Sequence, residues 1–162
     1  MKKVISILMT LAFMFTFITG CTAAESDKQA LDNEFLLTMQ IANPVMTVNG
    51  QEKNIDDDGT APTIVNDRTL VPVRAIIESM GGSVNWDSDT STAMLEYNND
   101  IITLTIGSET AYFNDNANTL DTAPQIINDR TMLPIRFIAE SFKFDVEWEQ
   151  GTQTITIKSN TL

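Results

Sequence analysis

Apolar and polar residues alternate in two stretches that lie far apart in the chain. Over 37–41, Leu, Met and Ile are separated by polar residues, and over 102–106 Ile, Leu and Ile are separated in the same way. This period of two is typical of a strand that buries one face. Asn49-Gly50 predicts a hairpin turn after the first stretch. Asn66-Asp67 and Asn128-Asp129 stand between apolar runs and predict further tight turns.

The period changes to that of a helix over 73–80 and over 135–142. Apolar residues stand at positions i, i+3, i+4 and i+7 of each stretch: Val73, Ile76, Ile77 and Met80, then Ile135, Ile138, Ala139 and Phe142. This spacing places them on one face of a helix. Pro72 and Pro134 fall at the first turn, where a missing N–H costs no hydrogen bond. Gly81 and Gly82 can end the first helix, whereas the second copy has Lys143 and Phe144 there, so we expect that helix to end differently.

Alternating runs follow each predicted helix. Val84 and Trp86 share one face of a strand, as do Val146 and Trp148, and a second alternating run follows each pair. Each unit is therefore strands, one helix, then strands. This order predicts an α+β fold in which an antiparallel sheet wraps over one helix.

The chain repeats itself. Residues 61–74 align with 123–136, an offset of 62 from Ala61 to Ala123, and upstream the offset becomes 65 because the first copy has three extra residues around 56–59. We therefore predict two tandem copies, 36–98 and 99–160. A unit of about sixty residues buries only a thin core, so we expect the copies to pack together.

Motifs of the repeated unit are similar to those of one family. They are Met46–Gly50, Thr60–Pro62, Asn66–Ile76 and Gly82–Trp86 in the first copy, and Ala123–Pro124 and Asn128–Glu140 in the second. The unit resembles the copper amine oxidase N-terminal-like domain, also called the stalk domain, of exported proteins of Gram-positive bacteria. The family usually has Asn-Gly at the second turn. Asp67 and Asp129 replace that glycine here, which leaves the turn type open. The resemblance implies a non-catalytic module and implies no copper.

The first twenty residues predict a secretory signal peptide. Lys2 and Lys3 precede an uncharged, largely apolar run over 4–18. This run is shorter than the ~20 residues that span a bilayer. Ile18-Thr19-Gly20-Cys21 resembles the bacterial lipobox, which implies a lipidated Cys21, a tether over 21–35 and a place on the outer face of the cytoplasmic membrane. The alternatives are a permanent membrane anchor and a general secretory signal followed by a chance cysteine.

Composition narrows the function. The chain carries 22 acidic and 10 basic residues, a net charge of −12, which argues against nucleic acids and anionic polymers as partners. It has no histidine to act as a general base near neutral pH. Its one cysteine, Cys21, is the predicted lipid attachment site and leaves no disulfide. We therefore predict no enzymatic activity and no cofactor.

Arginine and tryptophan recur at matching positions of the two copies, namely Arg68 and Arg130, Arg74 and Arg136, and Trp86 and Trp148. The arginines could bind anions near the helix starts. A structural role in ion pairs, such as Arg74 with Glu78 and Arg136 with Glu140, is the favoured interpretation. The tryptophans could stack on sugar rings, but their place in alternating strands beside a helix favours the core.

Acidic turns are the remaining candidates for chemistry. Asp56-Asp57-Asp58-Gly59 could hold Ca²⁺, which takes several oxygen ligands. The spacing is not that of an EF-hand loop, and the second copy lacks the insertion. Asp87 and Asp89 lie in a similar turn. We predict solvated turns and no metal site.

These patterns predict a lipid-anchored, extracytoplasmic module that is not an enzyme. It binds or spaces a component of the cell envelope, either a protein or a neutral glycan such as peptidoglycan. The alternative is an accessory protein that captures a small ligand or Ca²⁺ between the two copies. The oligomeric state stays open.

Overall fold

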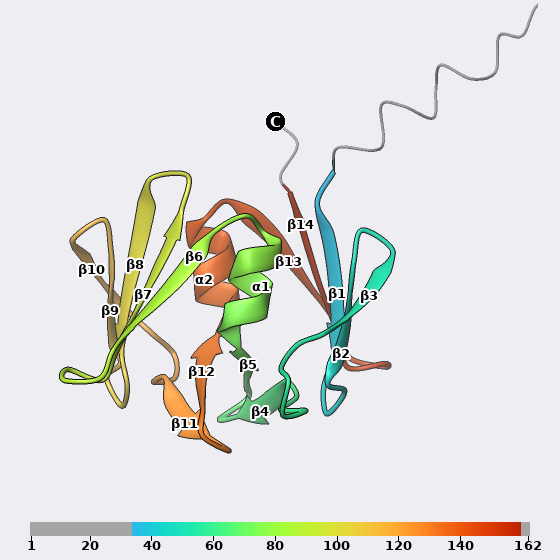
Figure 1. Cartoon of the computed structure of the whole chain (residues 1–162), viewed down its shortest axis with the longest axis horizontal. Coiled ribbons are helices and arrows are strands. Elements are labelled where there is room, and N and C mark those ends of the chain that lie inside the picture. The colour runs from blue at the N-terminus through green and yellow to red at the C-terminus, as the bar shows by residue number, and fades with distance from the viewer. Residues whose placement is uncertain (1–33, 160–162) are drawn as a thin grey trace, which may run out of the picture. The chain divides into compact units, whose positions relative to one another are not determined.

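The computed structural model describes residues 34–159 (Figure 1). The predicted signal peptide, Cys21 and nearly all of the predicted tether lie outside the described residues. Within them, neither helix is long and apolar enough to cross a membrane.

Strands dominate the described part of the chain. They make up 52% of the residues against 11% for helices, in three sheets. The strands are β1 Leu36–Gln40, β2 Val45–Val48, β3 Gln51–Asn54, β4 Thr63–Val65, β5 Arg68–Pro72, β6 Ser83–Asp87, β7 Thr92–Tyr97, β8 Asp100–Thr105, β9 Thr110–Phe113, β10 Asn116–Thr119, β11 Gln125–Ile127, β12 Arg130–Pro134, β13 Phe144–Glu149 and β14 Thr154–Ser159; the helices are α1 Val73–Ser79 and α2 Ile135–Ser141. The expected α+β fold is therefore wrong, and the protein is mainly β.

The expectation of two tandem units, each with a sheet wrapped over one helix, is also wrong, because each sheet contains strands of both halves of the chain. The β1 sheet has the order β13-β14-β1-β2-β3, the β8 sheet has the order β10-β9-β8-β7-β6, and the β5 sheet has the order β11-β12-β5-β4. Leu37 of β1 lies opposite Ile157 of β14, and Leu95 of β7 lies opposite Ile102 of β8. Each half thus gives its last two strands to the first three strands of the other half.

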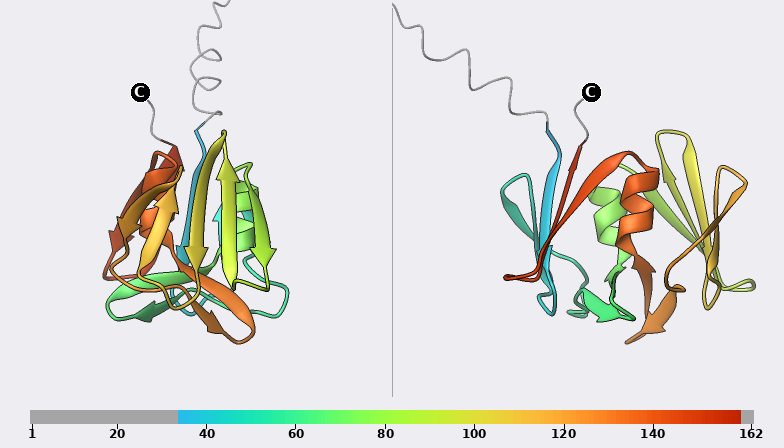
Figure 2. Two further views of the ribbon diagram at one scale, coloured as in Figure 1. Left: turned by 90° about the vertical axis from the view of Figure 1, so that its left-hand side faces the viewer. Right: turned by 180° about the vertical axis from the view of Figure 1, so that it is seen from behind.

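The β5 sheet joins the halves at its centre. Strands β5 and β12 pair antiparallel, with Val71 opposite Leu133, and these two residues are 62 positions apart. The equivalent strands of the two halves therefore pair around a pseudo-twofold axis. A helix follows each strand directly, so α1 and α2 lie side by side above this sheet and between the other two (Figures 1 and 2).

One hydrophobic core fills the space between the sheets and the helices. The predicted helix faces are confirmed, since all eight residues over 73–80 and 135–142 that we placed on them are buried. Ile76 and Ile138 are fully buried, which stabilises the fold by roughly 1.5–3 kcal/mol for each side chain. Tyr97 of the first half packs at 5.5 Å from Phe142 and 5.3 Å from Phe144 of the second half, measured between ring centroids. The core therefore belongs to both halves.

The predicted turns are confirmed, and their type is now defined. Asn49 and Gly50 have φ of 49° and 80°, and Asn66 and Asp67 have φ of 51° and 59°. Positive φ at both central residues is the signature of a type I′ turn, whose twist matches that of the paired strands. Asp67 adopts this conformation without glycine because a short polar side chain tolerates the left-handed region.

Both helices end with a residue in the left-handed region, so the expectation that the second helix ends differently is wrong. Gly81 has φ of 90°, and its N–H donates to the carbonyl of Glu78 at 3.1 Å. Lys143 takes the same position after α2 with φ of 64°, and its N–H donates to the carbonyl of Glu140 at 3.0 Å. Glycine adopts this conformation without steric cost, whereas lysine does not.

We predict that Lys143→Gly raises the free energy of unfolding by about 0.5–1 kcal/mol, because glycine relieves the left-handed strain. Gly81→Ala is the matched opposite change and should lower it by a similar amount. Urea denaturation followed by circular dichroism measures both. A destabilised Lys143→Gly variant would contradict this account of the helix end.

Candidate functional site

A groove with a volume of about 600 Å³ opens beside α2. Its walls come from the first turn of α2, strand β13 and the hairpin that joins β4 to β5. Its lining includes Ile64, Asp67, Arg68, Asp121, Arg136 and Trp148. The first half of the chain supplies the first three of these residues, and the second half supplies the others.

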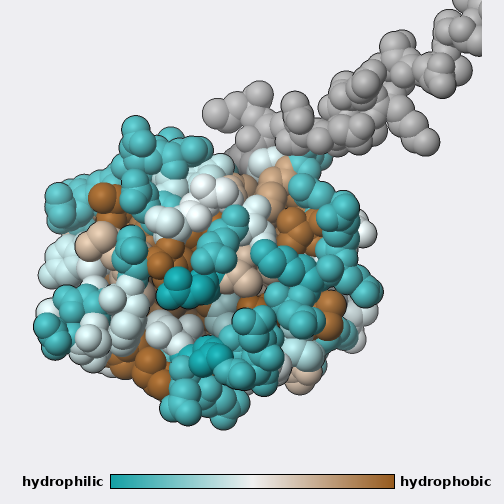
Figure 3. All heavy atoms as spheres, in the orientation of Figure 1, coloured by the Kyte–Doolittle hydropathy of each residue, from teal (hydrophilic) through white to brown (hydrophobic). Residues whose placement is uncertain are grey.

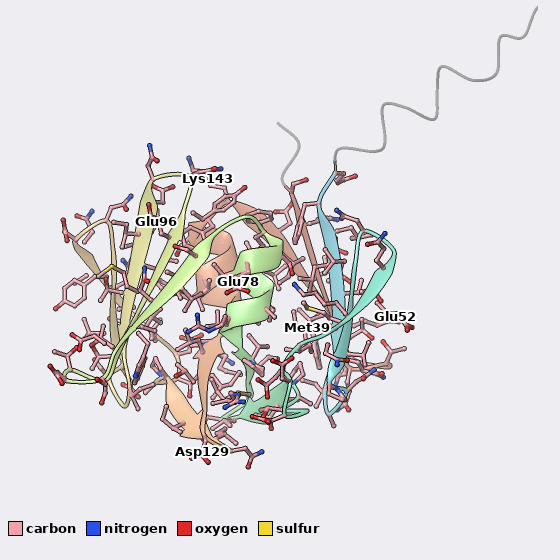
Figure 4. All side chains as sticks on the ribbon, in the orientation of Figure 1. Met39, Glu52, Glu78, Glu96, Asp129 and Lys143 are labelled. Atoms are coloured by element: carbon pink, nitrogen blue, oxygen red, sulfur yellow. The ribbon has the colours of Figure 1, made fainter. Side chains whose placement is uncertain are left out.

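A second groove, of about 470 Å³, opens beside α1. Its walls come from the first turn of α1, strand β6 and the hairpin that joins β11 to β12. The corresponding side chains are Ile126, Asp129, Arg130, Asp56, Arg74 and Trp86. Each occupies the position equivalent to its counterpart in the first groove. Figure 4 shows Asp129 at the tip of the β11–β12 hairpin.

The grooves collect two residue types that are rare in this chain. The sequence has two tryptophans and four arginines, and every one of them lines a groove. Each groove receives one tryptophan and two arginines. Each groove is also lined by three acidic residues, namely Asp67, Asp121 and Glu147 in the first and Asp56, Asp57 and Asp129 in the second. The grooves are therefore set apart by tryptophan and arginine side chains rather than by a net positive charge.

The tryptophans are not core residues, so that interpretation is wrong. Trp86 is 41% exposed and Trp148 is 37% exposed. Each ring lies beside the first turn of its helix, where the groove rather than the core adjoins the strand. Their neighbours Ile64 and Ile126 are exposed as well, at 41% and 48%. Figure 3 shows patches of hydrophobic surface between hydrophilic residues on the face in view.

Two of the arginines form ion pairs with residues of the other half of the chain. The Nε of Arg68 lies 2.7 Å from the carboxylate of Asp121. In the equivalent place, the Nε of Arg130 lies 2.6 Å from Asp56, and a terminal nitrogen of Arg130 pairs with Asp58. These ion pairs hold the hairpin of one half against the loop of the other, so the structural role that we expected for these residues is present.

The carboxylate of Asp56 stays ionised in this place. Its side chain is only 12% exposed, and this burial opposes ionisation. The hydrogen bonds from Arg130 and Thr60 outweigh the burial and hold the pKa of Asp56 below its ordinary value of 3.8. Asp56 is therefore the anionic partner of Arg130 at neutral pH.

Carboxylates of the acidic turns form ion pairs and hydrogen bonds with other groups of the protein. Asp56 and Asp58 both pair with Arg130. Asp87 accepts hydrogen bonds from the hydroxyl of Thr90 at 2.8 Å and the N–H of Asp89 at 2.9 Å, and these bonds lower its pKa. Among residues 34–159, no group of three or more His, Cys, Asp or Glu side chains is placed to hold a metal ion.

The other two arginines keep donors to spare. The predicted pairs with Glu78 and Glu140 are present but long, at 4.0 Å for Arg74 and 3.7 Å for Arg136. The two arginine side chains are 61% and 57% exposed. Arg74 also donates to the backbone carbonyl of Val84 at 3.2 Å. Exposed ion pairs of this length contribute little to stability, so both guanidinium groups can bind an anionic ligand.

The repeated sequence positions marked the arginines and tryptophans as candidate site residues but did not indicate how they are arranged. Nothing in the sequence indicated that Arg68 faces the groove of Trp148, or that Arg130 faces that of Trp86. It also missed Ile64 and Ile126, because a short apolar run between turns looks the same whether it is buried or exposed.

The sequence profile of the copper amine oxidase N-terminal domain matches residues 57–157, more than half of the chain. The protein belongs to this family. The domain is a non-catalytic module in the oxidases after which it is named. One copy is detected, and it extends from the first half across the second. This single span replaces the expectation of one family domain in each half.

The chain is also similar to a protein named protease inhibitor from Brevibacillus choshinensis. The two are 25% identical over 158 residues, which is 96% of this chain and 43% of the relative. The chain thus spans less than half the length of that relative.

We predict that Asp56→Asn lowers the free energy of unfolding by about 1–2 kcal/mol at pH 7, because it removes a charge-assisted hydrogen bond from a largely buried site. The folded-state pKa of Asp56 lies below the ordinary 3.8. The stability that the ionised carboxylate of Asp56 contributes is therefore fully present above the ordinary pKa of 3.8 and is lost as the pH falls through the folded-state pKa. Denaturant titrations from pH 7 to pH 2 measure it.

The equivalent substitution Asp121→Asn is the control, since the side chain of Asp121 is 68% exposed. Its effect at pH 7 should be smaller than that of Asp56→Asn, and the difference should disappear as the pH falls toward 2. Equal effects of the two substitutions at pH 7 would contradict the buried role of Asp56.

Proposed function

We propose that this protein is a non-catalytic, lipid-anchored module on the outer face of the cytoplasmic membrane, which binds or spaces a component of the cell envelope. One observation carries the binding role. Both tryptophans and all four arginines of an acidic chain line two equivalent grooves. Tryptophan and arginine are the residues that most often contribute binding energy at protein interfaces.

Membership of the copper amine oxidase N-terminal domain family supports a binding or spacing role rather than catalysis. The partner that we propose is a protein or a glycan that is not polyanionic, because the overall charge of −12 repels polyanions. The name of the Brevibacillus relative supports a protein partner. The pairing of Asp56 and Asp58 with Arg130 speaks against Ca²⁺ capture by that loop.

The lipid anchor rests on the lipobox resemblance at Cys21 and the signal peptide before it. Two or more acyl chains hold a protein stably on a membrane, whereas one chain is marginal. The exported module would then present its grooves to the envelope.

Removal of the lipid attachment site tests the proposed location on the membrane. We predict that Cys21→Ala moves the protein from the membrane fraction to the soluble fraction of an expressing Gram-positive host, because the thiol that receives the lipid is absent. Fractionation with metabolic labelling by a fatty acid measures this. Cys21→Ala protein that remained in the membrane fraction would overturn the anchor.

The grooves are tested with residues 22–162, which include every described strand and helix. We predict saturable, salt-resistant retention on cell-wall sacculi that keep their proteins, and at least about tenfold weaker retention of the Trp86→Ala/Trp148→Ala variant, since hot-spot aromatic residues dominate binding. Purified peptidoglycan, run in parallel, separates a glycan partner from a protein partner.

Tyr112→Ala is the matched control. Tyr112 is 46% exposed on β9 and lines neither groove, so its loss should leave retention unchanged. Thermal melting verifies that all variants fold. Equal retention of wild type and the double tryptophan variant would refute binding through the grooves.

A further inference from the structure

The geometry points to one class of ligand. We propose that each groove binds an extended peptide as an added strand, on β13 in one groove and on β6 in the other. The peptide carries an apolar residue and a carboxylate residue two positions apart. This inference rests on the proposed binding function and narrows the partner to a protein segment.

Both grooves lie at the free edge of a sheet. β13 is the outermost strand of the β1 sheet, and β6 is the outermost strand of the β8 sheet. An edge strand presents backbone N–H and C=O groups that have no partner strand, and an extended peptide can pair with them. The residues of these strands that line the grooves are Val146, Glu147 and Trp148 on β13, and Val84 and Trp86 on β6.

One backbone group of the edge already accepts a side chain. The carbonyl of Val84 accepts a hydrogen bond from Arg74, so this carbonyl faces the groove rather than β7. Soluble proteins usually protect such an edge with charged residues or a covering segment. The edge strand β13 carries the charged residues Asp145, Glu147 and Glu149, but these alternate with Val146 and Trp148, so their side chains point to the other face of the sheet. The face toward each groove carries an exposed tryptophan.

The side chains of each groove match alternate positions of an added strand. Residues two apart in a strand point to the same side, so two peptide side chains would enter one groove. The exposed Trp148 and Ile64 would contact the apolar side chain in one groove, and Trp86 and Ile126 would do so in the other. A neutral glycan would use the tryptophan but would gain little from the isoleucine.

The second peptide side chain meets an arginine. Arg136 and Arg74 have long ion pairs on their own helices, and Arg74 also donates one hydrogen bond to the Val84 carbonyl. The carboxylates of Asp121 and Asp56 are held by Arg68 and Arg130, and that of Glu147 is held by Lys158. Asp67 in one groove and Asp57 and Asp129 in the other also line the walls. An incoming carboxylate would therefore find a guanidinium group with spare donors, and arginine binds carboxylates with two parallel hydrogen bonds.

The two grooves are equivalent, so one partner with two such segments would bind both. Linking two binding events raises the overall affinity through effective concentration, without new contacts. This fits a module that spaces or holds a repeated envelope protein.

The test uses ¹⁵N-labelled residues 22–162 and NMR. The chain has two tryptophans, one in each groove, so two indole N–H signals report the grooves separately. Trp86→Phe and Trp148→Phe assign the signals. The probe is the synthetic peptide acetyl-Thr-Val-Thr-Glu-Thr-Val-Thr-Glu-amide. We expect both indole signals to shift saturably, and the amide protons of β6 and β13 to exchange about tenfold more slowly or better with peptide bound.

Two altered peptides separate strand addition from other binding modes. The same peptide with alternate backbone amides methylated keeps its side chains but cannot pair as a strand, and it should bind at least about tenfold more weakly. A peptide with Gln for Glu should also bind more weakly. In the protein, Arg74→Gln should weaken the response of the Trp86 signal alone, and Arg136→Gln that of the Trp148 signal alone.

Three results would overturn the inference: no saturable shift with the peptide, equal binding of the methylated peptide, or no effect of either arginine substitution. Chitotetraose is the glycan probe. If it shifted the indole signals and the peptide did not, a glycan would replace the peptide. If retention on sacculi still depended on the tryptophans, the proposed function would stand and only the peptide inference would fail. If the protein neither bound the peptide nor was retained on sacculi through the tryptophans, the inference and the proposed function would both fail.

Discussion

The antiparallel pairing of β5 with β12 is the constraint on which the other elements depend. It places Val71 opposite its equivalent Leu133 and sets the halves of the chain around one pseudo-twofold axis. Because a helix follows each of these strands without a loop, the pairing also fixes α1 beside α2. The last strands of each half then reach the first strands of the other, and a core too thin for either half alone becomes continuous.

This interlocking builds the grooves as well as the core. Arg68 reaches Asp121, and Arg130 reaches Asp56, across the boundary between the halves. Each groove therefore takes one wall from each half and forms only when both are folded together. The ion pairs at the rim satisfy these two arginines, and the arginines at the helix starts remain for a ligand.

The exposed edge strands are the structural basis of the recognition that we propose for the grooves. A mainly β protein with edge strands risks pairing with other chains. In this fold the edges of β6 and β13 lie beside a short helix and a hairpin, which narrow the approach to a groove. In the binding mode that we propose, a partner has to fit between these walls and match a tryptophan and an arginine, so the edge would bind selected partners rather than any exposed strand.

The sequence by itself determined the local structure. Side-chain period defined the buried helix faces, Asn-Gly and Asn-Asp pairs defined the turns, and Gly81 defined the end of the first helix. Only the tertiary structure decided which strands pair, because β7 resembles β14 and β1 resembles β8 in pattern, so pairing within a half and between halves looks the same in the sequence. The exposure of Trp86 and Trp148 followed from that choice. Burial depends on what packs against a strand, and alternation alone does not specify the neighbour.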